Sequence, residues 1–435
     1  MSKWLGADWR GHTCDIMHDI KCFVEMLCKG LVGYQPNGMY KAWKGLRRDA
    51  QHRDDCEVYD MFPDFYKSTT ALPPWRLSTD AVNVMDLRVR SMWWPHYMDK
   101  LCKKGHSFWT HSDRMWKCSH KFYILMAILP TCLSGFVPRV HRAIICIVTA
   151  LARLFGSVIS AAEADQRGLE RGARVLEKVS LFGLREELTR GLVLLEGCFP
   201  LAHLNPAMHH FVHYVMQTAD NGILGWVSMF SFERNNKRIK GLIRNSQHPL
   251  ATLANNIRMD IATRFLSWSE KDYKFPARPP VCVLWSRRKG NYHNCTERER
   301  FHLASYGICQ FRRVKAFETA RILGQHFRAG EWGCERCGSV ITTMYAGRSR
   351  YCNVKKFLQV QDKSFALVDW LSVPEYPYAP SRLVVRVRLM PDQHRHRCVI
   401  PVERIEPCSV AVMPDADGVH FYMMRDKGYD RATRR

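Results

Sequence analysis

The sequence has no long hydrophobic run that is free of charge and proline. Its most apolar stretch, from Phe122 to Ser160, is interrupted by Pro130 and Pro138 and contains three arginines. A helix that spans a membrane needs about 20 consecutive apolar residues, so we expect buried helices here and no membrane partner. The first residues also lack a basic segment followed by an apolar run, so no secretory signal is expected. The 17 cysteines are then expected to be reduced thiols.

Acidic residues are scarce relative to basic ones. The chain has 41 Asp and Glu against 65 Lys and Arg, which gives a formal net charge of +24. Such an excess favours a polyanionic partner, because each phosphate that is neutralised releases a condensed counterion. On charge alone, nucleic acid is the first candidate and an anionic membrane surface the second, and a basic protein with neither partner is the alternative; we expect nucleic acid and no membrane. A hydrophobic content of 46% indicates a globular chain rather than a disordered one.

The hydrophobic pattern changes along the chain and predicts an α+β protein. Helical spacing predicts a mainly helical N-terminal two-thirds, and short β-type runs from residue 341 onward predict a small antiparallel β domain. The helices are expected at 12–34, 139–160, 163–197, 206–219, 232–245 and 249–270. The expected segments are 1–120, irregular or helical; 121–273, helical; 274–340, a basic linker with a CxxC; 341–425, a small sheet or barrel; and 426–435, a mobile tail.

One segment, 204–245, carries a specific family resemblance. It combines a helix with two histidines, a turn with glycine and tryptophan, and a Phe-Glu-Arg block before a basic helix. This segment resembles the C-terminal region of CACTA (En/Spm)-type DNA transposases, although Ser231 replaces the proline that the family has before its phenylalanine. Segments 14–23, 115–130 and 174–200 are also similar to that family. The matching positions are Asp15, His18, His209, His213, Gly222, Trp226, Phe232, Glu233, Arg234, Lys240, Arg244 and Asn245.

The resemblance implies an RNase H-like transferase, in which three carboxylates hold two divalent metal ions for attack on a phosphodiester. By the order of the family motifs, Glu233 is the candidate third acid. Lys237 and Lys240 share its helix face, as phosphate-contacting residues would, and an ordinary Glu–Lys helix pair is the alternative. The other two acids are expected upstream of residue 14, so 1–120 would flank a truncated core. The chain alone is then expected to be inactive, with Mg²⁺ or Mn²⁺ bound only when a complete core is supplied.

Two basic segments are the predicted nucleic-acid surfaces: the helix at 234–244 and the linker at 274–313. Aromatic residues alternate with basic ones in the linker, which allows stacking on bases. We expect contact with the phosphates of duplex DNA, at transposon ends or nonspecifically, and a solvated charged face is the alternative. The candidate DNA-binding residues are Lys237, Arg238, Lys240, Arg244, Arg287, Arg288 and Lys289.

Cysteines near the start of the predicted β domain are candidate metal ligands. Cys334 and Cys337 form a CxxC, and Cys352 follows after a spacer that suits a structural Zn²⁺ site. His326 and the cluster at 394–398 are both open as the source of a fourth ligand. Ordinary core cysteines are the alternative.

Two histidine-containing pairs lie at helical spacing. His209 and His213 are one turn apart, which suits a shared metal ion, but histidines that pack against another helix are the alternative. Asp15 and His18 share a face of the first helix, where capping is the alternative to a functional role.

The sequence thus predicts the C-terminal portion of a CACTA-type transposase that binds DNA and lacks a complete catalytic site. A nuclear location follows from the DNA partner. The alternative is a non-enzymatic DNA- or chromatin-binding protein co-opted from a transposon, in which the sheet at 346–412 binds a protein partner. A zinc-binding module without nucleic acid is a third reading.

Overall fold

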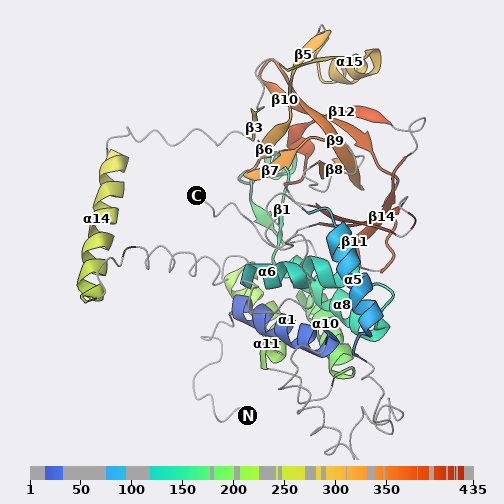
Figure 1. Cartoon of the computed structure of the whole chain (residues 1–435). Coiled ribbons are helices and arrows are strands. Elements are labelled where there is room, and N and C mark those ends of the chain that lie inside the picture. The colour runs from blue at the N-terminus through green and yellow to red at the C-terminus, as the bar shows by residue number, and fades with distance from the viewer. Residues whose placement is uncertain are drawn as a thin grey trace, which may run out of the picture.

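The structure of the protein is a computed structural model, and helices and antiparallel sheets occupy different parts of it (Figure 1). This arrangement confirms the expected α+β class, with a helical N-terminal part and a β-rich C-terminal part. The structure describes residues 15–32, 75–94, 118–176, 181–199, 206–224, 242, 247–269, 281–285, 291–309, 311–330, 339–345, 348–379, 381–390, 396–407, 410–415, 417 and 420–425.

The helical part is built from amphipathic helices whose apolar residues recur every three or four positions. In α1, for example, Ile16, Ile20, Phe23 and Leu27 are at most 1% exposed, because this spacing places them on one face. No helix in the described part of the chain is long and apolar enough to cross a membrane. The helices are α1 (Ile16–Val32), α5 (Thr79–Ser91), α6 (Cys118–Tyr123), the π-helical η4 (Ile124–Ile128), α7 (Leu129–Cys132), α8 (Pro138–Leu154), α9 (Ala161–Gln166), α10 (Leu181–Glu196), α11 (Pro206–Asn221) and α14 (Pro249–Ser269).

The helix predicted at 163–197 is wrong in its first half. After α9 the chain turns at Gly168 and Gly172, which have φ angles of 64° and 86°, and these angles end a right-handed helix. A short strand then pairs with one before α9, so that β1 (Ser157–Val158) and β2 (Arg174–Val175) form a two-stranded sheet. Helix α10 begins only at Leu181.

Three antiparallel sheets form the β-rich part. In the described residues the largest sheet has the strand order β12-β10-β9-β5-β4, with β8 also paired to β9. The other two have the orders β11-β14-β13 and β3-β6-β7. The strands are β3 (Cys282–Trp285), β4 (Tyr292–Asn294), β5 (Arg313–Phe317), β6 (Thr319–Ile322), β7 (Gln325–Arg328), β8 (Val340–Tyr345), β9 (Arg348–Val360), β10 (Lys363–Trp370), β11 (Val384–Arg388), β12 (Arg397–Pro401), β13 (Val410–Pro414) and β14 (His420–Arg425).

The segment 274–340, predicted as a linker, contains five of these strands and helix α15 (Glu297–Ala304). Strand β5 pairs with β9, so this segment belongs to the same sheet as the predicted β domain. The basic residues of β5, Arg313 and Lys315, stand on its exposed face, whereas Val314 and Ala316 are buried. The positive charge of the segment is therefore compatible with strands, because it alternates with core residues. The predicted tail at 426–435 lies outside the described residues.

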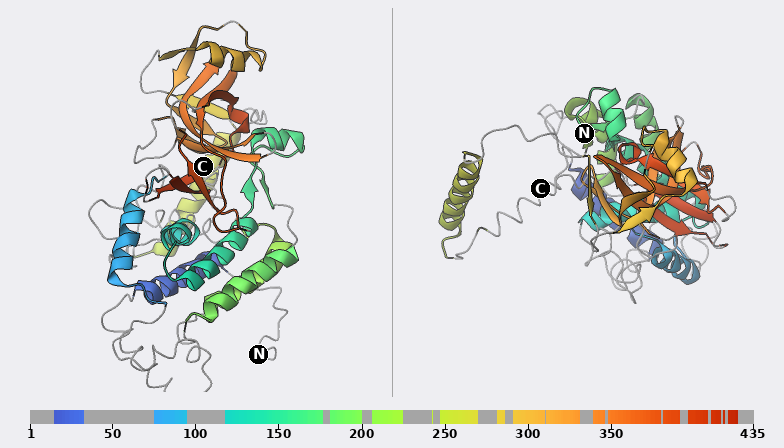
Figure 2. Two further views of the ribbon diagram at one scale, coloured as in Figure 1. Left: turned by 90° about the vertical axis from the view of Figure 1, so that its right-hand side faces the viewer. Right: turned by 90° about the horizontal axis from the view of Figure 1, so that it is seen from above.

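The helical and β-rich parts share a hydrophobic core. One buried cluster contains side chains of α1, α8 and α10 together with three from the β-rich part. These three are Leu383, just before β11, Val384 in β11 and Met413 in β13. Trp93, just after α5, donates its backbone N–H to the carbonyl of Val412 at 2.7 Å. Figure 2 shows the sheets stacked above the helical layer, with α14 set apart from both.

Candidate anion-binding pocket

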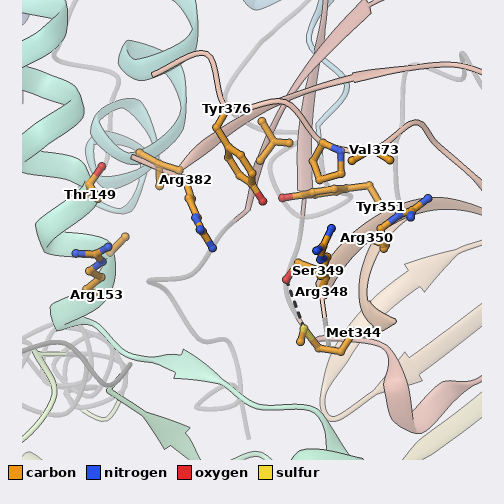
Figure 3. Close-up of a pocket in the computed structure, with 14 residues that line it drawn as sticks. Thr149, Arg153, Met344, Arg348, Ser349, Arg350, Tyr351, Val373, Tyr376 and Arg382 are labelled. Carbon is orange, nitrogen blue, oxygen red and sulfur yellow. Dashed lines mark hydrogen bonds between the residues drawn. The ribbon is translucent and has the colours of Figure 1, made fainter. Parts of the chain in front are cut away.

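A cavity of about 740 Å³ lies where helix α8 meets the β-rich part (Figure 3). Its walls come from the end of α8, the end of β8, the start of β9, the loop after β10 and the start of β11. Ligand pockets in proteins typically have volumes of about 300–1,000 Å³, so this cavity is large enough for a ligand. The lining residues are Thr149, Ala152, Arg153, Met344, Arg348, Ser349, Arg350, Tyr351, Val373, Pro374, Tyr376, Arg382, Leu383 and Val385.

The charge of the lining is positive. It includes Arg153, Arg348, Arg350 and Arg382, and none of the described lining residues is acidic. Charges of one sign in a concave site concentrate the electrostatic field and attract counter-ions. A guanidinium group also donates paired hydrogen bonds to phosphate or carboxylate. The cavity is therefore suited to an anion.

One of the four arginines is partly neutralised. Nη1 of Arg153, in the last turn of α8, lies 3.1 Å from Oε2 of Glu187 on α10. Burial raises the pKa of the Glu187 carboxyl, while Arg153 and Arg190 act in the opposite direction. The other three arginines have no ion pair with a described residue, so they supply most of the positive potential.

Aromatic rings position two of these arginines. The guanidinium carbon of Arg382 lies 5.5 Å from the centroid of the Tyr376 ring, and that of Arg350 lies 5.6 Å from the ring of Trp370. Cation–π contacts of this kind hold the flexible arginine side chain in place before a ligand arrives. Figure 3 shows Arg382, Tyr376 and Tyr351 extending into the space between α8 and the sheet.

Arg350 also has a hydrogen-bond donor that no described protein group satisfies. Its Nε atom is buried and has no acceptor among the described residues. A buried N–H without a partner costs about 1–3 kcal/mol, so native structures rarely retain one. This atom is shielded from the cavity, so an anion would reach it only after a shift of the Arg350 side chain.

A hydrogen bond between two elements holds the wall beside Arg382. The hydroxyl of Thr149 on α8 lies 2.7 Å from the hydroxyl of Ser381, the residue before Arg382. Ser381 also accepts the backbone N–H of Leu383 at 3.3 Å. The loop that carries Arg382 is thereby fixed to the helix that carries Arg153.

The histidine and aspartate positions predicted from the sequence lie elsewhere, on α1 and α11. Asp15 caps α1, since its Oδ1 accepts the backbone N–H of Met17 at 3.0 Å, and it also contacts the ring of His18. His209 and His213 are brought together, with their Nε2 atoms 3.1 Å apart on the solvent side of α11. Burial lowers the pKa of His213, and the nearby positive groups lower it further.

A buried polar contact between α1 and α11 was missed by the sequence prediction. Asp19, which is 7% exposed, accepts a hydrogen bond from the Tyr214 hydroxyl at 2.5 Å and lies 2.9 Å from Nδ1 of His210. The sequence did contain a signal for it, because the Asp19 carboxylate falls on the apolar face of α1, next to Ile20. A charged group at such a position needs a partner, because burying it alone is costly.

The remaining predicted site residues are not tested by the structure, apart from Cys352. That thiol is completely buried in the β core, burial raises its pKa well above the ordinary value, and it belongs to no group of three candidate ligands among the described residues. The two cysteines of the CxxC, and the predicted catalytic and DNA-binding residues, lie outside the described residues. They are Phe232, Glu233, Arg234, Lys237, Arg238, Lys240, Arg244, Arg287, Arg288, Lys289, Cys334 and Cys337.

Comparison with known proteins gives one family match. Residues 172–276 match a family described as a domain of unknown function, DUF4218. The matched region contains α10, α11 and α14, and it covers the whole of the segments 174–200 and 204–245. The comparisons with curated proteins and with solved structures found no match.

Proposed function

We propose that this chain binds the phosphodiester backbone of duplex DNA, and that it is the C-terminal portion of a CACTA-type transposase. The observation that supports DNA binding most directly is the arginine-lined cavity between α8 and the β-rich part. The net charge of +24 supports the same partner. The transposase assignment is supported by the resemblance at 204–245, and a nuclear location follows from the partner.

The chemistry of the cavity favours phosphate over a smaller anion. Arg348 and Arg382 are exposed and can reach a phosphate at the mouth, while Arg350 is half-buried behind them. Two tyrosines, Tyr351 and Tyr376, line the same space. Side chains of these types contact the backbone of nucleic acids, and such contacts position a protein without reading the sequence. We therefore propose binding with little sequence preference.

Replacement of the three cavity arginines tests this proposal. The variant carries Arg348→Gln, Arg350→Gln and Arg382→Gln, and its binding to a generic labelled duplex is measured by fluorescence anisotropy over a range of salt concentrations. Each phosphate contact contributes about 0.9 to the slope of log affinity against log salt. We expect the slope to fall in magnitude by about 2.7 if each arginine contacts one phosphate.

A matched control removes the same charge outside the cavity. Arg90, Arg321 and Arg328 are exposed and do not line it. Their replacement by glutamine should weaken binding less, because only long-range attraction is lost. Equal effects of the two triple variants would refute the cavity as the binding site. Wild-type protein that does not bind the duplex would refute DNA binding itself, and binding that does not depend on salt would refute contact with the phosphates.

The transposase part of the proposal has a separate test. The chain alone should not nick DNA in Mg²⁺ or Mn²⁺, because a two-metal site needs more carboxylates than Glu233. When an RNase H-like core of a CACTA transposase is supplied, cleavage should appear and should be lost in the Glu233→Ala variant. Unchanged cleavage by that variant would remove the catalytic role of Glu233, and nicking by the chain alone would contradict its predicted inactivity.

A further inference from the structure

The turn between strand β4 and helix α15 brings three different metal-ligating groups together. His293 lies in β4, Cys295 follows the strand, and Glu299 lies in the first turn of α15. One ligand atom from each residue lies within 4.8 Å of the other two. This cluster is far along the chain from the CxxC at Cys334, and it includes none of the residues predicted from the sequence.

The backbone of this turn is fixed independently of any ligand. Thr296 caps α15 in a reciprocal arrangement: its side chain accepts the N–H of Glu299 at 3.3 Å, and Oε2 of Glu299 accepts the N–H of Thr296 at 2.9 Å. The N–H of Cys295 donates to the carbonyl of Arg312 at 2.9 Å. The three candidate ligands are thus held on one pre-formed turn.

One carboxylate oxygen in the cluster has no protein partner. The Glu299 side chain is 2% exposed, and its Oε2 accepts both the Thr296 N–H and Nε2 of His293, which lies 2.8 Å away. Its Oε1 is buried without a hydrogen-bond partner in the described part of the chain. An unpaired buried carboxylate oxygen is costly, and a bound cation would remove that cost.

The surroundings suit a metal ion held by few ligands. Cys295 packs against the hydrophobic cluster that contains Leu303, Val314 and Leu358. An apolar shell restricts water and strengthens the attraction between a cation and its ligands. Two cations of the described part of the chain lie near the cluster: Nζ of Lys356 is 3.5 Å from Nδ1 of His293, and the charge of Arg300 acts on Cys295. Both side chains are exposed, so they can turn toward solvent.

We propose that His293, Cys295 and Glu299 bind one zinc ion, with water as the fourth ligand. Nitrogen, sulfur and oxygen together suit Zn²⁺, whereas Mg²⁺ and Ca²⁺ require oxygen ligands. Tetrahedral bonds of the usual lengths place ligand atoms about 3.3–3.6 Å apart, so small side-chain movements complete the site. Zinc binds the thiolate form of cysteine, so the Cys295 thiol must lose its proton when the metal binds. Zinc binding forms the Zn–S bond and releases that proton to solvent.

Zinc titration of the full chain tests the proposal. The background variant carries Cys334→Ser and Cys337→Ser, so that the CxxC does not contribute. The metal-free protein is titrated with Zn²⁺ against a chromophoric chelator, and we expect one equivalent to bind. Cys295→Ser should weaken this binding by at least about tenfold, since even the loss of an outer-shell partner typically costs 10–100-fold. The exposed Cys309, replaced by serine, is the matched control and should change nothing.

Two further measurements separate metal binding from a purely structural role. A capping box accepts glutamine at the position of Glu299, so the Glu299→Gln variant should keep the circular dichroism of the parent. Its affinity for zinc should fall by at least about tenfold. Co²⁺ in place of Zn²⁺ should give a thiolate-to-metal absorption band, and Cys295→Ser should abolish that band. Metal held by His209 and His213 would give no such band, because neither residue is a thiolate. The proposal is overturned if the background protein binds no zinc, or if Cys295→Ser and Glu299→Gln bind it as the background does.

Discussion

The buried hydrogen bond between Asp19 and Tyr214 should contribute strongly to the stability of the helical part. It joins α1 to α11, two helices that are about 190 positions apart in the sequence, through a distance of 2.5 Å. Both groups are shielded from water, since Asp19 is 7% and Tyr214 is 0% exposed. The aromatic rings of Phe23 and Phe211, 4.9 Å apart, pack beside this contact.

The expected magnitudes follow from this geometry. Tyr214→Phe removes only the hydroxyl, and a hydrogen bond to a charged group contributes about 1.5–3 kcal/mol. Asp19→Ala removes the acceptor and leaves the tyrosine hydroxyl buried without it, so we expect a loss of about 1–3 kcal/mol. His210→Ala should cost less than about 1 kcal/mol, because the His210 side chain is 41% exposed and its contact with Asp19 is screened by water.

Urea unfolding of the full chain, followed by far-ultraviolet circular dichroism, measures these losses in a double-mutant cycle. The Asp19→Ala and Tyr214→Phe changes should be coupled by about 1.5–3 kcal/mol, because they remove the same bond. Additivity of the two changes within about 0.5 kcal/mol would refute the reasoning. It would mean that the contact does not stabilise the packing of α1 on α11.

Three further changes probe other parts of the fold. Burial lowers the pKa of His141, so the unfolded chain takes up the proton more readily. The free energy of unfolding should therefore fall as the pH drops below the ordinary value of 6.5, and His141→Gln should reduce that dependence in urea titrations at several pH values. Gly191→Ala places a methyl group 2.8 Å from Ile147 and should destabilise the α8–α10 packing by up to about 2 kcal/mol, measured as a lower urea midpoint. Thr149→Val breaks the hydrogen bond to Ser381 and should lower the free energy of unfolding by about 1–3 kcal/mol in the same assay; an unchanged midpoint would show that this bond is not stabilising.

The sequence pattern predicts the fold class and many of the elements correctly. Apolar spacing places α1, α11 and α14 within a few residues of their observed bounds, and the β-type runs after residue 341 correspond to β9, β10, β11, β12 and β14. The helix predicted at 139–160 is correct only as far as Leu154, because β1 occupies part of its predicted end. Local periodicity is sufficient here because each element buries one face. It is insufficient at Gly168 and Gly172, where single glycines inside an apolar pattern adopt positive φ and end α9.

The candidate site is less predictable because it is assembled from distant segments. Arg153 and Arg382 are more than 200 residues apart in sequence, and nothing in either segment indicates that they line one cavity. The net charge predicts an anionic partner but does not say where it binds. The basic clusters at 234–244 and 287–289 are visible in the sequence, yet they lie outside the described residues and stay predictions.

The shared core constrains how the cavity can respond to a ligand. Leu383, adjacent to Arg382, is buried in the same cluster as the side chains of α8, and Thr149 is hydrogen-bonded to Ser381 on the other side of that arginine. The two walls are therefore parts of one packed unit rather than two domains that close on a ligand, because close-packed interiors resist continuous deformation. A bound phosphate would meet arginines that are already positioned, with little ordering cost. The affinity lost by the arginine variants should consequently report the contacts removed, and not a change in the closure of the cavity.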